Sequence, residues 1–373
     1  MNILILSTNP QSEATQQIKR EAELRGHLVR ISYPNDLYCY ISDVNGHDSI
    51  FDKGERITSI SFDVVIPRLS GNGTDTGITA LRHITENMSK PSTVLPNGVM
   101  IARDKFWTCQ VLSKVKIKVP KTIFAGSPQN PQFLIDKVGG LPCVVKTIQG
   151  SQGYGVSILE TKLSANTTLQ TMYSNDLNIH LQQFLKADNK DIRAFVVDGE
   201  VVASMERTAN KGDFRANLSQ GGSGKKIDLT PEETKTAIES ANALGLGVAG
   251  VDILRLKDGF KVIEVNSNPG FGIAEVTGVN VAKKIVEYAE RLVNKEEKKD
   301  NQTDAKTALM KSKGYVQTAN RSVILSGQRV EMLAFYSTYS TNRESTLFIY
   351  NGNTFAYATN NDSTVAPFDL KNL

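Results

Sequence analysis

Residues 251–270 constrain the fold more than any other part of the chain. They read VDILRLKDGFKVIEVNSNPG, two apolar, strand-like runs on either side of a turn near Asp258. Glu264 and Asn266 are two positions apart and therefore share one face of their strand. Asp252 and Glu264 are equally far from Asp258. A loop with an odd number of residues would place these two carboxylates opposite each other, whereas a two-residue Asp-Gly turn would place them on opposite faces.

Two opposed carboxylates need a cation between them. At about 5 Å they would repel by roughly 3 kcal/mol at an effective dielectric constant of about 20. Two carboxylates and an asparagine carbonyl suit Mg²⁺, which commonly takes further ligands from substrate phosphates. We therefore interpret Asp252, Glu264 and Asn266 as metal ligands. The alternative, an exposed hairpin with charged positions, is disfavoured by the apolar composition of both runs.

Whole-chain properties limit the class of protein. The chain has 373 residues, more than one core supports, so about two to four domains are expected. Its 3 cysteines are widely spaced, which argues against a disulfide framework or a zinc site and indicates a reducing cytosol. The net charge of +4 fits an anionic substrate such as a nucleotide, and nucleic-acid binding is not expected. No apolar run approaches the ~20 residues of a membrane span, so we expect a cytoplasmic protein without a membrane partner.

Local signals divide the chain into parts. The N-terminal part begins strand–helix–strand, which predicts a parallel sheet, and its first turn lacks the GxGxxG of dinucleotide sites. Further along, an Asp198-Gly199 hairpin turn and a capping box at Thr230 are expected. The last part, rich in Tyr, Phe, Ser and Thr, predicts a small β-rich extension with a hairpin at Asn351-Gly352. The fold class is α/β with some α+β character, and the expected parts are residues 1–95, 96–180, 181–294, a linker at 295–306, and 307–373.

Two segments before the hairpin are suited to phosphates. GSQGYG, at residues 150–155, lies between predicted strands, so it is neither a P-loop nor a Rossmann motif. Its glycines would let backbone N–H groups approach phosphate oxygens, although a flexible hairpin turn is the alternative. Lys146 lies in an apolar strand and needs an anionic partner, for which an ATP phosphate is suited. Lys105 falls in a helix predicted at residues 102–113, where a solvated lysine is the alternative.

A third segment, residues 205–226, is basic and rich in glycine. It includes Arg207 and Arg215, and arginines bind carboxylates and phosphates through two hydrogen bonds. A solvated basic loop is the alternative. The 4 histidines are scattered and no Ser/His/Asp or Cys/His arrangement stands out, so catalysis by a side-chain nucleophile is not indicated.

These features resemble the RimK-type ATP-grasp ligases over residues 1–293. The strings that carry the resemblance are REAELRGHLVRI, DVVIPRLS, IARDK, LIDKVGGLPCVVK, GSQGYGV, GDFRANLSQGG, GLGVAGVDILR and EVNSNPG. The resemblance implies an ATP-grasp fold with an N-terminal parallel-sheet pre-ATP-grasp domain, a central lid subdomain and a C-terminal subdomain with the metal site. It implies an ATP-dependent carboxylate–amine ligase that forms a peptide bond through an acyl-phosphate.

The resemblance also assigns roles to individual residues. ATP would be held by two lysines, a lid, an adenine hinge, a ribose carboxylate and an arginine, namely Lys105, Lys146, Gly150, Ser151, Gln152, Gly153, Tyr154, Gly155, Gln182, Gln183, Phe184, Leu185, Asp191 and Arg215. Two Mg²⁺ ions, which Mn²⁺ can replace, would bind Asp252, Glu264 and Asn266. The catalytic residues would be Lys146, Arg215 and Asn217. Substrate carboxylates would be held by Arg68 and Arg207.

The same resemblance implies the substrates. L-glutamate is the expected amino acid, and the expected acceptor is the C-terminus of a protein, with small-subunit ribosomal protein six as the first candidate. Another peptide, a carrier protein or a small molecule is the alternative acceptor, and a non-catalytic, ribosome-associated nucleotide-binding module is the alternative function. A homo-oligomer is expected from the resemblance alone. The chain departs from the family pattern in its Gln182-Gln183-Phe184 hinge, in a shorter segment after EVNSNPG, and in its C-terminal tail.

Overall fold

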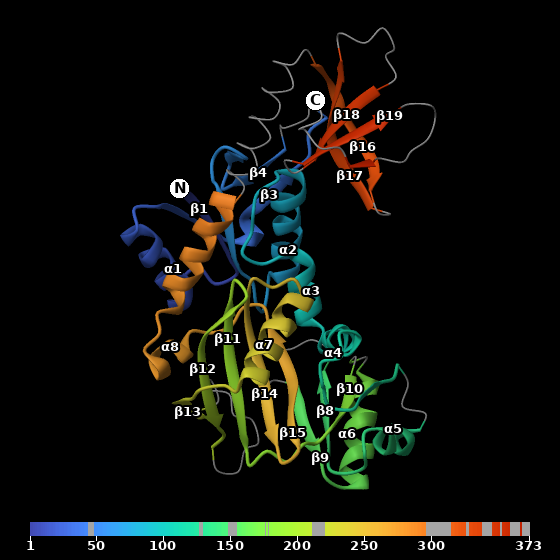
Figure 1. Cartoon of the computed structure of the whole chain (residues 1–373). Helices are drawn as coiled ribbons and strands as arrows, with labels where there is room; N and C mark the ends of the chain where they lie inside the picture. The colour runs from blue at the N-terminus through green and yellow to red at the C-terminus, as the bar shows by residue number, and fades with distance from the viewer. Residues whose placement is uncertain are drawn as a thin grey trace. The chain divides into compact units, whose positions relative to one another are not determined.

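The structure is a computed structural model that describes residues 1–43, 48–126, 130–147, 155–175, 177, 179–210 and 221–295, together with the strand backbones at 315–325, 328–337, 345–350, 353–358 and 366–367. The chain divides into two compact units, Met1–Leu292 and Val293–Leu373. Figure 1 shows the elements of both units. Within the described part of the chain, no helix is long and apolar enough to cross a membrane.

The chain begins with a three-stranded parallel sheet of order β2-β1-β6, as the sequence predicts. Its strands are β1 (Asn2–Ser7), β2 (Leu28–Ser32) and β6 (Val64–Arg68). Helix α1 (Glu13–Leu24) begins where the Ser12 side chain accepts a hydrogen bond from the Thr15 N–H, and it ends before Gly26, which has a φ of +80°. The core of this sheet is a run of fully buried aliphatic residues in β1. Arg68 therefore lies at the C-terminal edge of a parallel sheet, where ligands commonly bind.

A small antiparallel sheet and several helices complete the N-terminal part. The sheet has the order β3-β4-β5. Its strands are β3 (Leu37–Tyr40), β4 (Ser49–Asp52) and β5 (Glu55–Thr58). The helices are the 3₁₀ turn η1 (Pro34–Asp36), α2 (Thr74–Arg82), the π-helical turn η2 (His83–Asn87) and α3 (Pro96–Arg103).

The helix expected at residues 102–113 is wrong in its boundaries. Two helices are present, α3 and α4 (Lys105–Lys114), and the chain leaves the helical conformation at Asp104. The Asp104 carboxylate accepts hydrogen bonds from the N–H groups of Phe106 and Trp107 at 2.9 and 2.8 Å, so it caps α4. Lys105 is consequently the first residue of a helix rather than an interior one.

The central part is a four-stranded antiparallel sheet of order β7-β10-β8-β9. Its strands are β7 (Thr122–Phe124), β8 (Cys143–Thr147), β9 (Val156–Leu159) and β10 (Ile179–Gln183). Helices α5 (Pro131–Lys137) and α6 (Lys162–Ser174) cover one face and share a core with Val145 and Leu181. Because side chains alternate along a strand, Lys146, His180 and Gln182 lie on the other face.

A five-stranded antiparallel sheet of order β13-β12-β11-β14-β15 follows. Its strands are β11 (Lys190–Val197), β12 (Glu200–Thr208), β13 (Ser223–Lys226), β14 (Val248–Leu256) and β15 (Gly259–Asn266). The predicted Asp198-Gly199 turn and the Thr230 capping box are both confirmed. The latter opens α7 (Pro231–Ala243), which packs on this sheet, and α8 (Gly272–Thr277) and helical residues 281–295 come after it.

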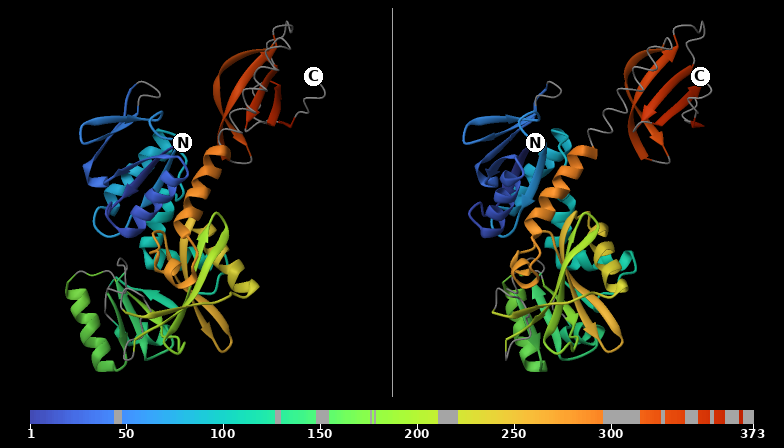
Figure 2. Two further views of the ribbon diagram at one scale, coloured as in Figure 1. Left: turned by 90° about the vertical axis from the view of Figure 1, so that its left-hand side faces the viewer. Right: turned by 60° about the vertical axis from the view of Figure 1, so that its left-hand side comes forward.

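The four-stranded central sheet and the five-stranded sheet lie side by side in both views of Figure 2. Helix α4 bridges them, since it contacts β7 of the central sheet and both α7 and β15. The backbone also joins them, because the Val262 N–H donates to the Lys118 carbonyl at 2.9 Å. The face of the central sheet that carries Lys146 is directed at β14 and β15, because Asp252 and Glu264 act electrostatically on Lys146.

The second unit contains the β-rich extension that the sequence predicts. Its strands follow each other in an antiparallel sheet of order β16-β17-β18-β19-β20. They are β16 (Tyr315–Leu325), β17 (Gln328–Ser337), β18 (Ser345–Tyr350), β19 (Asn353–Ala358) and β20 (Ala366–Pro367). Tyr350 pairs with Asn353, which confirms the expected hairpin.

Candidate active site between two sheets

Asp252 and Glu264 lie opposite each other on β14 and β15. The loop between the strands has only two residues, Lys257 and Asp258, a length that was expected to separate the carboxylates. A register shift between Asp252 and Ile253 compensates for this loop. Such a β-bulge adds one residue to one strand and re-aims the side chains beyond it. The expectation that a two-residue loop would place the carboxylates on opposite faces is therefore wrong, because the bulge returns Asp252 and Glu264 to the same face.

Asn266 continues this face of β15. It pairs with Gly250, and its Nδ2 donates to the Gly250 carbonyl at 3.4 Å, which leaves the amide oxygen to act as an acceptor. Two carboxylates and an amide oxygen are ligands of the kind that Mg²⁺ prefers, so the residues fit the ion. Among the described residues no group of three or more His, Cys, Asp and Glu side chains could hold a metal. Phosphate or water oxygens would therefore have to complete the coordination.

A buried ionic network surrounds Asp252, which is only 2% exposed. Arg193 donates to both carboxylate oxygens, with Nη2 2.7 Å from Oδ2, and Arg207 Nη2 lies 3.0 Å from Oδ2. Arg207 also donates to both oxygens of Asp191, at 2.7 and 2.8 Å. Burial alone would raise the pKa of Asp252, but Arg193 and Arg207 outweigh it and hold this pKa below its usual value. Asp252 therefore stays ionised, as a metal ligand must.

One lysine from the central part faces these carboxylates, and a second lysine lies beside it. Lys146 is partly buried on β8, and its pKa is lowered by desolvation, against the attraction of Glu264. Lys105, on the first turn of α4, is close enough to lower the pKa of Lys146 further. The arrangement thus brings Lys146 toward two anions of the neighbouring sheet, with the positive charge of Lys105 next to it. It is suited to bind a chain of phosphates together with a divalent cation.

The predicted adenine hinge joins the two sheets. Gln182 is buried, and its Nε2 donates to Thr122 Oγ1 at 3.0 Å. Gln183 accepts a hydrogen bond from Lys261 Nζ at 3.3 Å, across the junction between β10 and β15. Phe184 and Leu185 follow and are half-buried. The side-chain amide oxygen of Gln183 is thus paired with Lys261, a contact that was not predicted from the sequence.

Asp191 borders a cavity of about 750 Å³ next to the hinge. Its other lining residues come from the segment after the hinge and from the tip of the β14–β15 hairpin, and include Lys186, Ala187, Leu256 and Lys257. The carboxylate itself is occupied by Arg207. Its expected role at the ribose stays a prediction.

Arg68 brings the N-terminal part to the site. It is 6% exposed, its Nη2 donates to the Pro269 carbonyl at 2.9 Å, and its guanidinium carbon lies 4.8 Å from the centre of the Phe271 ring. Its Nε is buried without a hydrogen-bond partner in the described part of the chain. Desolvation lowers its pKa to about 10. A buried guanidinium with a spare donor is suited to hold a carboxylate, as expected for a substrate.

Several predicted site residues lie outside the described part of the chain, namely Gly150, Ser151, Gln152, Gly153, Tyr154, Arg215 and Asn217. Gly155 is described and has a φ of +73°. Its carbonyl accepts a hydrogen bond from the Thr147 N–H at 2.9 Å, and a Cβ at this position would collide with Thr147 Oγ1. Glycine is therefore required at this end of the predicted lid.

Arg193 and His180 were missed in the sequence. Arg193 lies two positions after Asp191 in an otherwise apolar strand, and a buried arginine in such a run indicates an acidic partner on the neighbouring strand. Its register partner is Asp252. His180 pairs with Lys146, and this pairing is visible only once the strand order is known.

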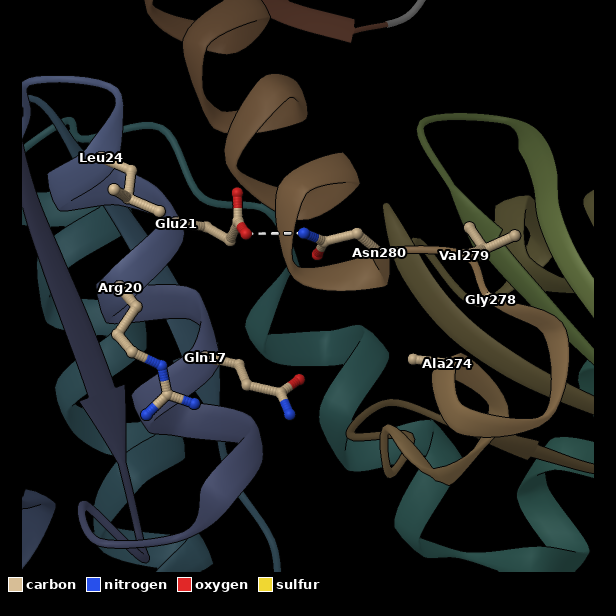
Figure 3. A pocket seen from close by; sticks show the side chains of 8 residues that line it. All are labelled: Gln17, Arg20, Glu21, Leu24, Ala274, Gly278, Val279 and Asn280. Carbon is tan, nitrogen blue, oxygen red and sulfur yellow. Dashed lines mark hydrogen bonds between the residues drawn. The ribbon is translucent and has the colours of Figure 1, made fainter.

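A pocket of about 360 Å³ lies away from these residues (Figure 3). It is formed by α1 and by the segment around α8, and Glu21 closes one side by accepting a hydrogen bond from Asn280 Nδ2 at 2.6 Å. Its lining includes none of the predicted site residues. The convergence of opposed charges between the two sheets is therefore the stronger candidate for the active site.

Comparison with known proteins identifies the family. A RimK PreATP-grasp domain matches residues 1–97, and a RimK-like ATP-grasp domain matches residues 102–289. The chain belongs to the RimK-like ATP-grasp family. It is accordingly an ATP-grasp ligase, and its pre-ATP-grasp domain contains the predicted parallel sheet.

Relatives and solved structures agree with this assignment. "Probable alpha-L-glutamate ligase 1" of Shewanella frigidimarina (strain NCIMB 400) is 41% identical over 297 residues, which cover 79% of this chain and 96% of that protein. The ATP-grasp ligase PsnB, in complex with a phosphomimetic variant of a minimal precursor, Mg and ADP, has a TM-score of 0.62 at 16% identity, over 78% of this chain and 98% of that chain. The macrocyclase MdnC of Microcystis aeruginosa MRC, bound with the precursor peptide MdnA, has a TM-score of 0.61 at 16% identity, over 79% and 100%.

Proposed function

We propose that this ligase uses ATP to join L-glutamate to the carboxylate of a protein or peptide acceptor. The observation that carries the proposal is the approach of Lys146, with Lys105 beside it, to the opposed carboxylates Asp252 and Glu264. The name of the Shewanella relative supports glutamate as the amino acid. Retention of both lysines and all three expected metal ligands argues against a module that only binds nucleotide.

The reaction would proceed in two steps. An acceptor carboxylate oxygen attacks the γ-phosphorus of ATP, the bond to the β-phosphate oxygen breaks, and ADP leaves with that electron pair. The glutamate amine then attacks the acyl carbon, loses a proton, and displaces inorganic phosphate. Mg²⁺ bound at Asp252, Glu264 and Asn266 would supply charge neutralisation at the phosphates.

The chain's own residues would orient and stabilise these groups. Lys105 and Lys146 would offset the charge on the phosphates, and preorganised cations of this kind are worth most where water is excluded. Arg215 and Asn217 would face the transferred phosphoryl group. Arg68 and Arg207 would hold substrate carboxylates. Arg68 is the stronger candidate, because its Nε has no partner among the described residues and Arg207 is occupied by two aspartates.

The C-terminus of ribosomal protein six is the first candidate acceptor. A precursor-type peptide is the second, and it is favoured by the fold likeness to PsnB and MdnC, whose structures contain precursor peptides. We further propose that the chain works as a homo-oligomer and that Mn²⁺ can replace Mg²⁺. The β-rich second unit is a candidate for recruiting the acceptor.

Mass spectrometry tests the proposal. The full chain is incubated with ATP, Mg²⁺, glutamate and a panel of acceptors that includes ribosomal protein six, precursor-type peptides and free carboxylic acids, and ADP and AMP are both measured. Glutamyl additions with ADP release are expected. AMP release would overturn the acyl-phosphate mechanism, and additions of another amino acid would overturn the choice of glutamate.

A further inference from the structure

His180 lies on the face of the central sheet that also carries Lys146. It pairs with Lys146 on β8 and with Phe124 on β7, and paired residues of an antiparallel sheet share a face. The Phe106 ring of α4 packs over it, with ring centroids 6.3 Å apart, and Phe106 also contacts Phe124 at 5.6 Å. The imidazole therefore packs against the Phe106 ring, with Phe124 as its cross-strand neighbour and Lys146, which is expected to bind phosphate, on the other neighbouring strand.

Both nitrogens of this imidazole are without hydrogen-bond partners among the residues that the structure describes, although His180 is only 1% exposed. A buried polar group without a partner destabilises the fold, and native proteins rarely leave one. The nearest charged groups, Lys146 and Lys105, can only donate hydrogen bonds. Burial and these two cations lower the pKa of His180 to about 3. The ring is therefore neutral at physiological pH, with one N–H to donate and no acceptor beside it among the described residues.

We propose that His180 is a further nucleotide ligand, whose ring N–H donates to a phosphate oxygen between Lys105 and Lys146. This proposal rests on the proposed function, because it needs ATP in the cleft. Phosphate oxygens would supply the hydrogen-bond acceptor that no described residue provides beside His180. A neutral donor adds a directed hydrogen bond without adding a third positive charge beside two lysines, and the apolar rings around it strengthen that bond.

The proposal also accounts for the presence of a histidine at a position where an apolar residue would make the free protein more stable. A leucine at this position would pack against the aromatic rings and leave no polar atom unsatisfied. The unpartnered imidazole lowers the stability of the free protein, and the hydrogen bond to a bound phosphate would compensate for this loss. Removal of its nitrogens should therefore act in opposite directions on stability and on nucleotide affinity, a signature that simple damage to the sheet does not give.

The test compares His180→Leu with the wild-type full chain. We expect the melting temperature without ligand to be unchanged or higher. We expect the Kd of Mg-ADP, measured by titration calorimetry without acceptor or glutamate, to rise about tenfold, which corresponds to about 1.4 kcal/mol and to one hydrogen bond to a charged group. The KM for ATP should rise while the KM for glutamate stays constant.

Thr93→Val is the matched control. Thr93 also has a buried hydroxyl that no described residue hydrogen-bonds, but it lies in the N-terminal part beside the parallel sheet. Its Kd for Mg-ADP should equal that of the wild type. If His180→Leu does not fold, His180→Phe, which keeps the ring packing, is measured by the same criteria.

The outcomes separate the two proposals. A wild-type chain that does not bind Mg-ADP would overturn the proposed function together with this inference. A wild-type chain that binds, with a His180→Leu Kd within about twofold of it, would overturn the role of His180 and leave the ligase assignment standing. Equal weakening by Thr93→Val would also overturn the role, since the effect would then follow from any lost buried hydroxyl or ring nitrogen.

Discussion

Replacing Asp252 by asparagine removes a buried charge and almost nothing else. The side chain keeps its shape and one carbonyl oxygen, but Arg193 loses the carboxylate that accepts two of its hydrogen bonds, while Arg207 retains Asp191. Each close arginine–carboxylate contact corresponds to about 4 kcal/mol at an effective dielectric constant of about 20, partly offset by desolvation. Removing one partner of a buried ion pair typically costs 3–5 kcal/mol. We expect Asp252→Asn to lower the free energy of unfolding by about 3 kcal/mol.

The measurement is urea unfolding at pH 7. Trp107 is the only tryptophan and lies on α4, which bridges the two sheets, so its fluorescence reports on the first unit. The control is Asp198→Asn. Asp198 forms a more exposed pair with Arg291 at 2.7 Å and has a φ of 51°, which asparagine tolerates. This control should cost less than about 1 kcal/mol.

The pH dependence adds a second criterion. The folded-state pKa of Asp252 lies below the model-peptide value of 3.8, so its stabilising contribution is present above that pH and is lost as the pH falls through the folded pKa. The difference between wild type and Asp252→Asn should therefore be constant from pH 5 to 8 and shrink only below about pH 4. Equal losses for the two variants at pH 7 would refute the buried-network argument.

Three further substitutions probe other parts of the site. Glu264→Gln should raise the Mg²⁺ concentration for half-maximal turnover at least tenfold, with a melting temperature close to that of wild type. Arg68→Met should raise the KM of a carboxylate substrate about tenfold and leave the KM for ATP unchanged, which steady-state kinetics can separate. Gly155→Ala should lower stability by about 1–2 kcal/mol, measured by urea unfolding, because its φ is +73° and the new Cβ meets Thr147. An unchanged Mg²⁺ requirement, KM or stability, respectively, would contradict these expectations.

Local signals predicted much of the fold. Ser12 and Gly26 define both ends of α1, and the Asp198-Gly199 turn sets the first pairs of β11 and β12, up to a register shift between Phe195 and Val196. These features depend on backbone conformations that a few residue types favour, so they can be recognised without knowing the tertiary structure. The same type of signal was present at Asp104, an N-cap residue, but the helix-forming residues around it suggested one continuous helix.

Other features depend on how strands pair. The bulge beside Asp252 compensates for a two-residue loop, and its position follows from packing on both faces of the sheet rather than from nearby residues. The partnership of Arg193 with Asp252 requires β11 to lie beside β14, strands that are far apart in sequence. Asp252, Glu264 and Asn266 could thus be proposed as ligands from spacing alone, while the arginines that hold Asp252 could not.

The distribution of satisfied and unsatisfied polar groups distinguishes the two sides of the site. On the C-terminal sheet, two arginines and two aspartates satisfy one another, so this side is ordered before any substrate arrives. On the central sheet and the N-terminal part, both ring nitrogens of His180 and Nε of Arg68 are buried without a partner in the described part of the chain. Preorganised groups lose little entropy on binding, and unpaired donors gain hydrogen bonds only when a ligand supplies acceptors. We therefore expect the nucleotide phosphates to be recognised near His180 and the acceptor carboxylate near Arg68, while Asp252 is already held by its two arginines.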